Sequence, residues 1–591
     1  MRRLRASVLP AVDLSFDISL DVARYLKHVG DKIFSRLLAA PPLQAHTTHA
    51  HRPKRTGTSH PTMFAAVTRR VARVSCGAHR AHRFTAPMGT TAQATSPSSG
   101  WMGRPESDSR AFTGEDAERG DVRTPADSDR EHFRENPSVA LWSEWGFDGT
   151  PEGARALFTE CVSSARTPRD AAYWAYHVAR SSWFLGQGAA GIIASSLGGL
   201  GGPSGGGAPL AGDGSLRSGV AAGSRLMAEA LQTYRQDLAH INAGTYKAPY
   251  DMDPNHRQFN PAFVASKTAK FLSEAASTLE KNRAAKRSEN TGEPADAPET
   301  KVWMDSPLYP DYYLKTFHWQ TDGWLSSRSA EVYETSTETL FLGRQDAMQR
   351  TALVPLSEWM REKGTVDGAG AKFLELACGT GRFLTFVRDN YPEMDVTGLD
   401  LSPFYLAEAR KNGAYWEKLR RRKQSSPAGL VTETLARVGG LAKAAGLPVP
   451  PMPSTPRDDA WDEAERETLG GCEYVQAQAE QMPFPDASFD AITCVYLLHE
   501  LPVDARREVA KEAARVLKPG GVLVLADSIQ LGDRPRMDKN LGRFGDFNEP
   551  YYRSYIEQAL VEVFGPEGAG LEPWTKDLCS STKVLSFRKP E

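Results

Sequence analysis

The segment Phe373-Leu374-Glu375-Leu376-Ala377-Cys378-Gly379-Thr380-Gly381-Arg382-Phe383 decides the fold of this chain. It begins as an apolar run that predicts a strand, passes through a turn with two glycines and continues as a helical pattern. Gly379 and Gly381 let the backbone approach a ligand closely, and the amides at the start of the following helix favour polar or anionic groups. The segment therefore predicts the first strand and turn of a nucleotide-binding βαβ unit.

A carboxylate follows the next apolar strand. Asp400 closes the strand expected at 395–400, nineteen residues after Gly381, and a carboxylate at this place is positioned to bind ribose hydroxyls. The dinucleotide pattern G-x-G-x-x-G is incomplete, because Leu384 stands in place of its third glycine. The two strands thus indicate a ligand with a ribose and disfavour a nicotinamide cofactor.

Strands alternate with helices through the C-terminal half of the chain. Strands are expected at 372–377, 395–400, 473–477, 489–495, 521–527 and 583–588, and helices at 382–390, 403–416 and 505–517. This alternation predicts an α/β fold with a Rossmann-like, doubly wound and mostly parallel sheet in a domain at 301–591. A basic patch and a proline cluster interrupt the series at about 417–471, where we expect a mobile insertion.

A small all-helical region precedes this domain. Apolar residues recur at helical spacing in four stretches between 136 and 285, the second of which is expected to end near Gly186. The glycine-rich segment 188–214 is predicted to be a flexible insertion. Another helix-like stretch runs from Ala330 to about Lys363. The aromatic residues of the helical region are interpreted as core.

Composition limits the classes of function. Lys and Arg number 71 and Asp and Glu 73, a net charge of −2, so global charge gives no argument for nucleic acid or an anionic membrane surface. The six cysteines form no C-x-x-C pair, which excludes a zinc ribbon, and no metal is expected. No apolar stretch reaches about 18 residues, so no transmembrane segment is expected, while peripheral membrane contact stays open.

The N-terminal sequence is unlike the rest. Residues 32–99 contain no Asp or Glu and are rich in Arg, Ser and Thr. This composition is typical of an organelle transit peptide, and we interpret 1–135 as such a peptide followed by a disordered linker. Composition does not separate a plastid from a mitochondrion; the resemblance of residues 309–350 described below favours the plastid. A merely disordered basic tail is the alternative interpretation.

Four motifs, in order, resemble the class I S-adenosylmethionine-dependent methyltransferases. The glycine segment resembles their first motif, and Asp400 matches their ribose-binding acid. Residues 476–490 and 515–521 are similar to the D-A-E-x-L-P-F-P-D-x-S-F-D and R-V-L-K-P-G-G segments of the ubiquinone/menaquinone C-methyltransferase-like branch. Residues 309–350 resemble uncharacterised methyltransferases of cyanobacteria and plastid-bearing eukaryotes. The resemblance implies a seven-stranded sheet and S-adenosyl-L-methionine as cofactor.

The resemblance also implies site residues. Ala377 stands where the branch often has a glycine, and Gln478 where an acid or amide often meets the adenine amine. His499, after the fourth strand, is a candidate base with Glu500 as its orienting carboxylate or a substrate contact, unless His499 only packs the loop. The implied cofactor-binding residues are Glu375, Ala377, Cys378, Gly379, Gly381, Asp400, Leu401, Gln478, Ala479 and Glu480.

The predicted function is methyl transfer to a small, apolar or aromatic acceptor. Residues 494–497 lack the N/D-P-P-Y/F tetrapeptide with which base and amide methylases often clamp their substrates, so a protein or nucleic-acid substrate is disfavoured. Two alternatives stay open: a catalytically inactive methyltransferase fold that acts as a binding or regulatory protein, and a nicotinamide-dependent oxidoreductase. The sequence leaves the acceptor and the oligomeric state open.

Overall fold

The computed structural model describes residues 123–147, 149–197, 216–274, 306, 308–314, 323–425, 471–542 and 549–591. All of them belong to one compact unit, Ser107–Glu591. The transit-peptide-like segment, residues 198–214 of the glycine-rich segment and residues 426–470 of the expected insertion lie outside the described residues.

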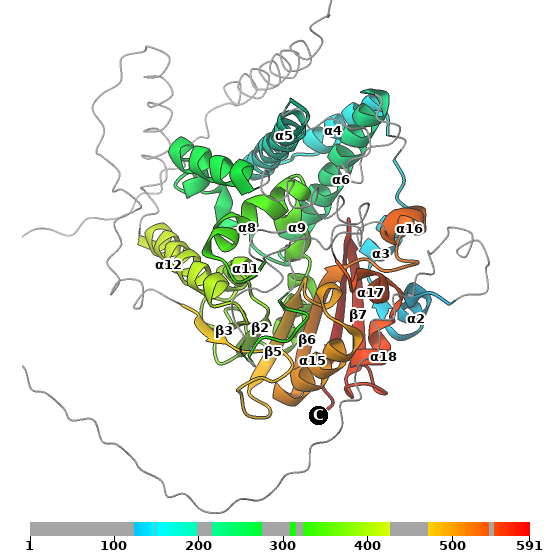
Figure 1. The fold of residues 1–591 in the computed structure, drawn as a ribbon, viewed down its shortest axis with the longest axis vertical. Coiled ribbons are helices and arrows are strands. Elements are labelled where there is room, and N and C mark those ends of the chain that lie inside the picture. Colours follow the sequence, from blue (N-terminus) through cyan, green and yellow to red (C-terminus); the bar gives the residue numbers. More distant parts are fainter. Residues whose placement is uncertain are drawn as a thin grey trace, which may run out of the picture. The chain divides into compact units, whose positions relative to one another are not determined.

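An eight-stranded sheet forms the centre of this unit, in the order β1-β7-β8-β6-β5-β2-β3-β4 (Figure 1). All neighbouring strands are parallel except that β8 runs antiparallel to β6 and β7. The predicted doubly wound, mostly parallel sheet is confirmed, and the two-residue edge strand β1 extends the expected seven strands to eight. The strands are β1 Arg134–Glu135, β2 Lys372–Leu376, β3 Asp395–Asp400, β4 Glu473–Gln476, β5 Phe489–Val495, β6 Leu517–Ser528, β7 Glu572–Cys579 and β8 Thr582–Arg588.

Helices cover both faces of the sheet. The side chains of β2 alternate: Phe373 packs in one hydrophobic cluster, and Leu374 and Leu376 pack in the other. Parallel strands are covered on both faces in this way, because the crossover helices lie above and below them. One face carries α10 Leu353–Glu362, α11 Arg382–Asn390 and α12 Pro403–Ser425, and the other carries α15 Val503–Val516, α17 Tyr552–Glu557 and α18 Leu560–Phe564.

The helical region is not a separate domain. Tyr173 and Leu231 from this region share one hydrophobic cluster with Phe383 of α11. In Figure 1 the helices α5 and α6 lie beside α8 and α9, which lead into the sheet, and α4 packs on α6. The expected boundary between two domains is therefore replaced by a continuous core. The helices are α3 Pro137–Glu144, α4 Pro151–Ser163, α5 Pro168–Leu197, α6 Leu216–Asn242, α8 Ser327–Leu340 and α9 Gln345–Arg350, together with a helix at 261–274.

Several predicted boundaries are corrected. Helix α5 continues to Leu197 instead of ending near Gly186, so the first part of the expected flexible segment is helical. The stretch 330–363 is three helices: the chain turns at Gly343, which has a φ of 78°, between α8 and α9, and breaks again at residues 351–352 before α10. Helix α12 extends to Ser425, past the expected start of the insertion. Arg420 explains this extension, since it donates to Asp389 at 2.8 Å and to the Thr385 carbonyl at 2.9 Å.

The chain is ordered before residue 135, where a linker was expected. Helix α2 Pro125–His132 begins with a capping box in which Thr124 and Asp127 bond to each other's backbone amides. Asp129 on this helix lies 3.0 Å from Lys576 and 2.8 Å from Lys583, and all three side chains are buried. These ion pairs attach α2 to strands β7 and β8, so residues 123–135 belong to the folded unit rather than to the expected linker.

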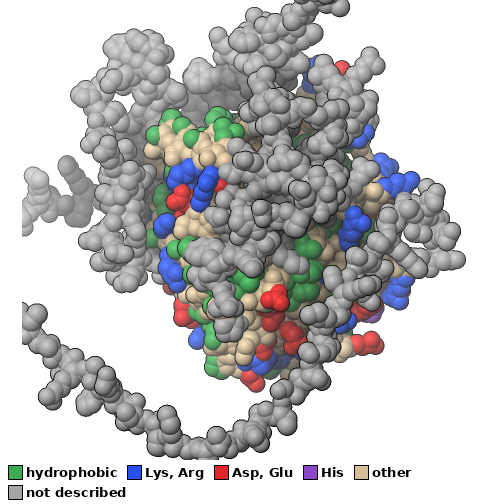
Figure 2. All heavy atoms as spheres, viewed as in Figure 1, with side chains coloured by type: hydrophobic (Ala, Val, Ile, Leu, Met, Phe, Trp, Pro, Cys, Tyr) green, Lys and Arg blue, Asp and Glu red, His purple; other side chains and the backbone are tan. Residues whose placement is uncertain are grey.

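The visible surface of the described residues mixes both charge signs. Lys, Arg, Asp and Glu side chains are interspersed in Figure 2, in keeping with the net charge of −2. In the described part of the chain, the helices fall short of the length and apolar character that crossing a membrane requires.

One buried ion pair joins α6 of the helical region to α9. Arg350, at the end of α9, donates to both carboxylate oxygens of Asp237 on α6, at 2.9 and 2.7 Å. The hydroxyls of Tyr173 and Tyr246 donate to the same carboxylate. Both charged side chains are buried. The four groups therefore satisfy one another, and removal of either charged partner leaves the other buried without its counter-ion.

We expect Asp237→Ala to lower the free energy of unfolding by about 3–5 kcal/mol, because the Arg350 guanidinium is then buried without its counter-ion. Urea unfolding followed by circular dichroism measures this loss. The matched control is Glu160→Ala, which removes an exposed ion pair with Arg235 and should cost less than about 1 kcal/mol. Equal losses in the two variants would contradict the assignment.

Candidate functional site

The glycine turn between β2 and α11 has a backbone that few residues adopt. Gly379 and Gly381 have φ values of 54° and 74°, and Ala377 also has a positive φ, 53°. A Cβ on Gly381 would lie 3.2 Å from the Cβ of Ala409, so the close contact between the turn and α12 favours glycine there. Ala377 occupies a conformation that costs an L-residue free energy. Backbone strain at this place is typical of a ligand-binding turn.

Asp400 holds this turn from the neighbouring strand. Its Oδ2 accepts a hydrogen bond from the Gly379 amide at 2.8 Å, and its Oδ1 accepts one from the Ser402 amide at 2.8 Å. Burial raises the pKa of Asp400 to about 6, although both amides act to lower it. A carboxylate oxygen has two lone pairs, so each oxygen keeps the capacity for one further bond. Asp400 therefore fixes the loops and still offers acceptors to a ligand.

A cavity of about 100 Å³ opens beside Asp400. It lies at the carboxyl end of β2, where the strand order reverses between β3 and β5. Ligands of open α/β sheets bind at this place. The cavity is lined by Tyr312, Tyr313, Trp324, Tyr333, Ala377, Gly379, Leu399, Asp400, Leu401, Tyr405, Ala477, Ala479, Glu480, Val495, Tyr496, Leu497, Glu500 and Leu501.

The cavity brings together seven of the predicted site residues. Six come from the predicted cofactor set and one from the predicted catalytic pair. The carboxylate of Glu480 accepts a hydrogen bond from Tyr312. The lining residues that the sequence predicted are Ala377, Gly379, Asp400, Leu401, Ala479, Glu480 and Glu500.

The other predicted cofactor residues support the turn from outside the cavity. Glu375 is buried, its Oε2 has no hydrogen-bond partner, and burial beside Asp400 raises its pKa well above the usual range. Cys378 packs against Gly398, and Gly381 packs against Ala409. Gln478 donates to the carbonyl of Leu308 at 2.6 Å, so its amide binds a covering segment. This contact differs from the adenine contact that the sequence suggested.

His499 is placed differently from the predicted base. Its Nδ1 lies 2.6 Å from Oδ1 of Asp527, and its Nε2 lies 4.0 Å from Glu500. Burial lowers the pKa of His499, but the Asp527 carboxylate outweighs burial and raises it to about 9. A ring that is already protonated at neutral pH does not accept a proton. His499 therefore forms an ion pair with Asp527 that holds the loop after β5. The neighbouring Glu500 lines the cavity.

The aromatic cover of the cavity was missed by sequence reasoning. Tyr333 and Trp324 pack edge-on against Tyr405, with ring centroids 5.4 Å apart in each pair. Tyr312 and Tyr313, which precede Trp324 in the sequence, also line the cavity. The repeated tyrosines at 309–313 and the tryptophan at 324 were a usable signal, since clustered aromatic side chains often wall a pocket.

Two protein-family models match the part of the chain that contains the glycine turn and Asp400. Residues 373–425 match one family model described as a methyltransferase domain, and residues 425–525 match a second model with the same description. The two matches begin in β2 and end in β6, so they contain the glycine turn and Asp400. Residues 373–525 are a methyltransferase domain. The cofactor of this methyltransferase domain is S-adenosylmethionine.

Relatives of the methyltransferase domain share only part of their length with the chain. An uncharacterised methyltransferase of Bacillus subtilis is 37% identical over 87 residues, which are 15% of this chain and 33% of that protein. A ubiquinone/menaquinone biosynthesis C-methyltransferase of Pseudomonas putida is 41% identical over 63 residues, 11% of this chain and 24% of that protein. The chain thus matches about a third or less of the length of each of these curated relatives.

A solved structure, the PH0226 protein from Pyrococcus horikoshii, is also similar to the chain. It is 17% identical, with a TM-score of 0.24, and the match covers 41% of this chain and 90% of that one.

The residues around the cavity of the methyltransferase domain fit S-adenosylmethionine. Asp400 offers unused acceptors for ribose hydroxyls, and Ala477 and Ala479 offer small apolar surfaces for a flat base. Gly379 carries no side chain toward the cavity, and a Cβ there would lie 3.9 Å from the Tyr405 ring. The cavity is smaller than the roughly 300 Å³ of a typical small-molecule site. The aromatic cover must therefore move when the cofactor binds.

We expect the stability contributed by His499 to depend on pH. The folded-state pKa of about 9 exceeds the ordinary value of about 6.5, so the folded state binds the extra proton between these values. The contribution is complete below about pH 6.5 and is lost as the pH rises through 9. The difference in unfolding free energy between the protein and His499→Gln should be about 3 kcal/mol larger at pH 6 than above pH 9.

Urea unfolding at pH 6, 7.5 and 9.5 tests this dependence. A constant difference for His499→Gln would show that His499 is not ion-paired.

Proposed function

We propose that this chain is an S-adenosylmethionine-dependent methyltransferase that transfers a methyl group to a small, apolar or aromatic acceptor. The observation that carries the proposal is Asp400, which holds the strained glycine turn and lines the cavity at the reversal of strand order. The motif at 476–490 supports the ubiquinone/menaquinone C-methyltransferase-like branch as the nearest type of reaction. Among the curated relatives, the Pseudomonas putida protein bears that name.

The chain would hold the cofactor through a small number of groups. Asp400 would accept hydrogen bonds from the ribose hydroxyls, and the turn at Gly379 would let the backbone approach the cofactor closely. The start of α11 would favour the carboxylate of the methionine part, because its first amides have no partner within the helix. Asp400 and Gly379 already line one cavity, and the start of α11 follows Gly379 in the same turn.

The reaction needs little chemistry from the protein itself. The cofactor supplies an electrophilic methyl group, which the acceptor takes through a new bond as the carbon–sulfur bond breaks. The chain's task is to align the acceptor and exclude water. The rings of Tyr312, Trp324 and Tyr333 cover the cavity and would exclude water. Glu500, which lines the cavity, is the side chain placed to accept a proton that the acceptor loses.

We expect Asp400→Ala to weaken S-adenosylmethionine binding at least about 100-fold. Each hydrogen bond to a charged group contributes about 1.5–3 kcal/mol, and two ribose hydroxyls lose their partner. Isothermal titration calorimetry measures the affinity, with Asp486→Ala as control because the Asp486 carboxylate is exposed. Unchanged affinity in Asp400→Ala would show that Asp400 does not bind the cofactor and would overturn the proposed binding site. Tighter binding of a nicotinamide cofactor would overturn the proposed reaction in favour of an oxidoreductase.

The acceptor is identified by product labelling. The full chain is incubated with methyl-labelled S-adenosylmethionine and a fractionated organelle extract, and labelled small molecules are isolated. Cofactor binding without any labelled product would favour an inactive fold with a binding role.

We also propose that residues 1–100 direct the protein to a plastid. The acid-free, Arg-, Ser- and Thr-rich composition of residues 32–99 supports an organelle address. The resemblance of residues 309–350 to methyltransferases of cyanobacteria and plastid-bearing eukaryotes favours the plastid. We expect a fluorescent reporter fused to residues 1–100 to accumulate in plastids, and a fusion to residues 63–100 tests whether Met63 begins the address. Mitochondrial signal would select the other organelle, and diffuse cytosolic signal from both fusions would leave a disordered tail.

A further inference from the structure

A second and larger cavity lies on the helical side of the methyltransferase domain. Its volume is about 670 Å³, in the range of small-molecule sites. Helices α5, α8, α9 and α12 wall it, together with the helix at 261–274 and the short helices η1 Tyr250–Met252 and η2 Arg257–Phe259. The proposed function gives this cavity no role.

Apolar side chains supply the larger part of the cavity surface. Two of its rings, Trp183 of α5 and Phe259 of η2, keep 49% and 45% of their surface exposed, although large apolar side chains are usually buried. Phe184, Met252 and Phe263 also line the cavity. An apolar ligand would cover surface that now faces water, and removal of apolar surface from water favours binding.

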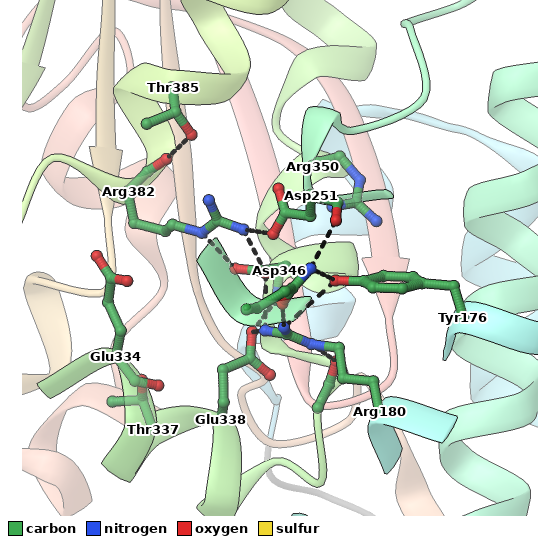
Figure 3. A network of polar contacts seen from close by, with 12 residues as sticks. Tyr176, Arg180, Asp251, Glu334, Thr337, Glu338, Asp346, Arg350, Arg382 and Thr385 are labelled. Atoms are coloured by element: carbon green, nitrogen blue, oxygen red, sulfur yellow. Dashed lines mark hydrogen bonds and ion pairs between the residues drawn. The ribbon is translucent and has the colours of Figure 1, made fainter. Parts of the chain in front are cut away.

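A network of buried ion pairs closes one side of the cavity (Figure 3). Arg180 lies 2.8 Å from Glu338 and 3.0 Å from Asp346. Arg382 lies 2.6 Å from Asp346 and also contacts Asp251. Figure 3 shows that these side chains point toward one another from α5, α8, α9, α11 and the η1 segment. The charges of this network are therefore paired within the protein and are not offered to a ligand.

Two further carboxylates of the lining pair with lysines that lie outside the described lining. Glu331 lies 2.5 Å from Lys270, and Glu408 lies 3.1 Å from Lys411. A ligand is therefore not needed to supply either carboxylate with a positive charge.

The two remaining basic side chains of the lining are also engaged. Lys267 donates to the carbonyl of Glu331 at 2.6 Å. Arg257 donates to Asn412 at 2.7 Å, and its guanidinium lies 4.5 Å from the centroid of the Tyr415 ring. A charged ligand would lose its hydration on entering the cavity, and it would meet only groups that already have partners. The cavity therefore disfavours ligands of either charge sign.

Helix α8 lies between this cavity and the cofactor cavity. Its Tyr333 borders both of them. The next residue, Glu334, accepts hydrogen bonds from Thr380 of the glycine turn at 3.0 Å and from Asn412 at 2.9 Å, and these contacts hold α8 against the turn. A molecule in the larger cavity is thus separated by α8 from the cofactor, which makes it a second ligand and not the methyl acceptor.

We propose that the larger cavity binds an uncharged small molecule with an apolar ring system, as a second ligand beside the cofactor. The exposed rings of the wall contact its apolar body, and the internally paired charges of the lining disfavour a charged head. The proposal does not rest on the proposed function, because the walls of this cavity are the helices around it and not the residues that hold the cofactor.

Three probes with the same aromatic body test the proposal: 1-pyrenemethanol, 1-pyrenemethylamine and 1-pyreneacetate. Fluorescence titration with the full chain at pH 7, without cofactor, gives their affinities. We expect the uncharged alcohol to bind at least about tenfold more tightly than the cationic amine and the anionic acetate, because each charged probe must lose hydration. An amine or an acetate that binds as tightly as the alcohol would overturn the proposal, and so would the absence of binding by all three.

Two variants locate the binding. Ala179→Trp fills the cavity from an exposed position of α5 and should abolish binding of the alcohol. The matched control is Ala156→Trp on α4, whose exposed position lies outside the described lining, and it should keep the affinity. Trp183→Ala removes a half-exposed ring of the wall and should weaken the alcohol about tenfold. Undiminished alcohol binding in either cavity variant would place the probe elsewhere and overturn the proposal.

The cofactor distinguishes this proposal from the proposed function. Saturating S-adenosylmethionine should leave binding of the alcohol intact, and Asp400→Ala should keep its affinity for the alcohol. Displacement of the alcohol by the cofactor would place the probe in the cofactor cavity and overturn the proposal. Alcohol binding by a chain that does not bind S-adenosylmethionine would leave the larger cavity's assignment intact and overturn the proposed function. Cofactor binding without alcohol binding would do the reverse.

Discussion

The buried ion pairs of Arg382 join the helical region to the glycine turn of the sheet. Arg382 is the first residue of α11, directly after the glycine turn, and it pairs with Asp346 and Asp251. The same Asp346 also binds Arg180 from α5. Three segments far apart in the sequence thus meet beside the turn that borders the cofactor cavity. Breaking a buried ion pair costs free energy, because the remaining charge loses its partner. The network therefore holds the helices in place against the turn.

The sheet was predictable because its signals are local. The segment 373–383 carries an apolar strand, a glycine turn and a helix start within eleven residues, and α11, β3 and β5 have the bounds that periodicity gave them. The ends of α5 and α12 were not predictable in this way. Glycines would ordinarily weaken the end of α5, and α12 is continued by the contacts of Arg420 with Asp389 and Thr385, which are visible only in three dimensions.

The cofactor side of the site was predictable for a similar reason, and the catalytic side was not. Asp400 and Gly379 follow directly from strand ends, which meet at one edge of any parallel sheet. The role of His499 depends on Asp527, a residue on another strand that the sequence does not pair with it. The aromatic cover comes from Tyr312, Trp324 and Tyr333, which lie outside the family motif, so only the clustering of aromatic residues could have indicated it.

The ion pairs of Asp129 bear on the order in which the chain folds. Asp129 and Lys583 are 454 positions apart, and β1 finds its only strand neighbour among the described residues in β7. Contacts across such separations form late, because a long loop must close first. During synthesis, the edge of the sheet stays open until the last hairpin leaves the ribosome. Helix α2 and strand β1 therefore pack onto the sheet only after β7 and β8 have been synthesised.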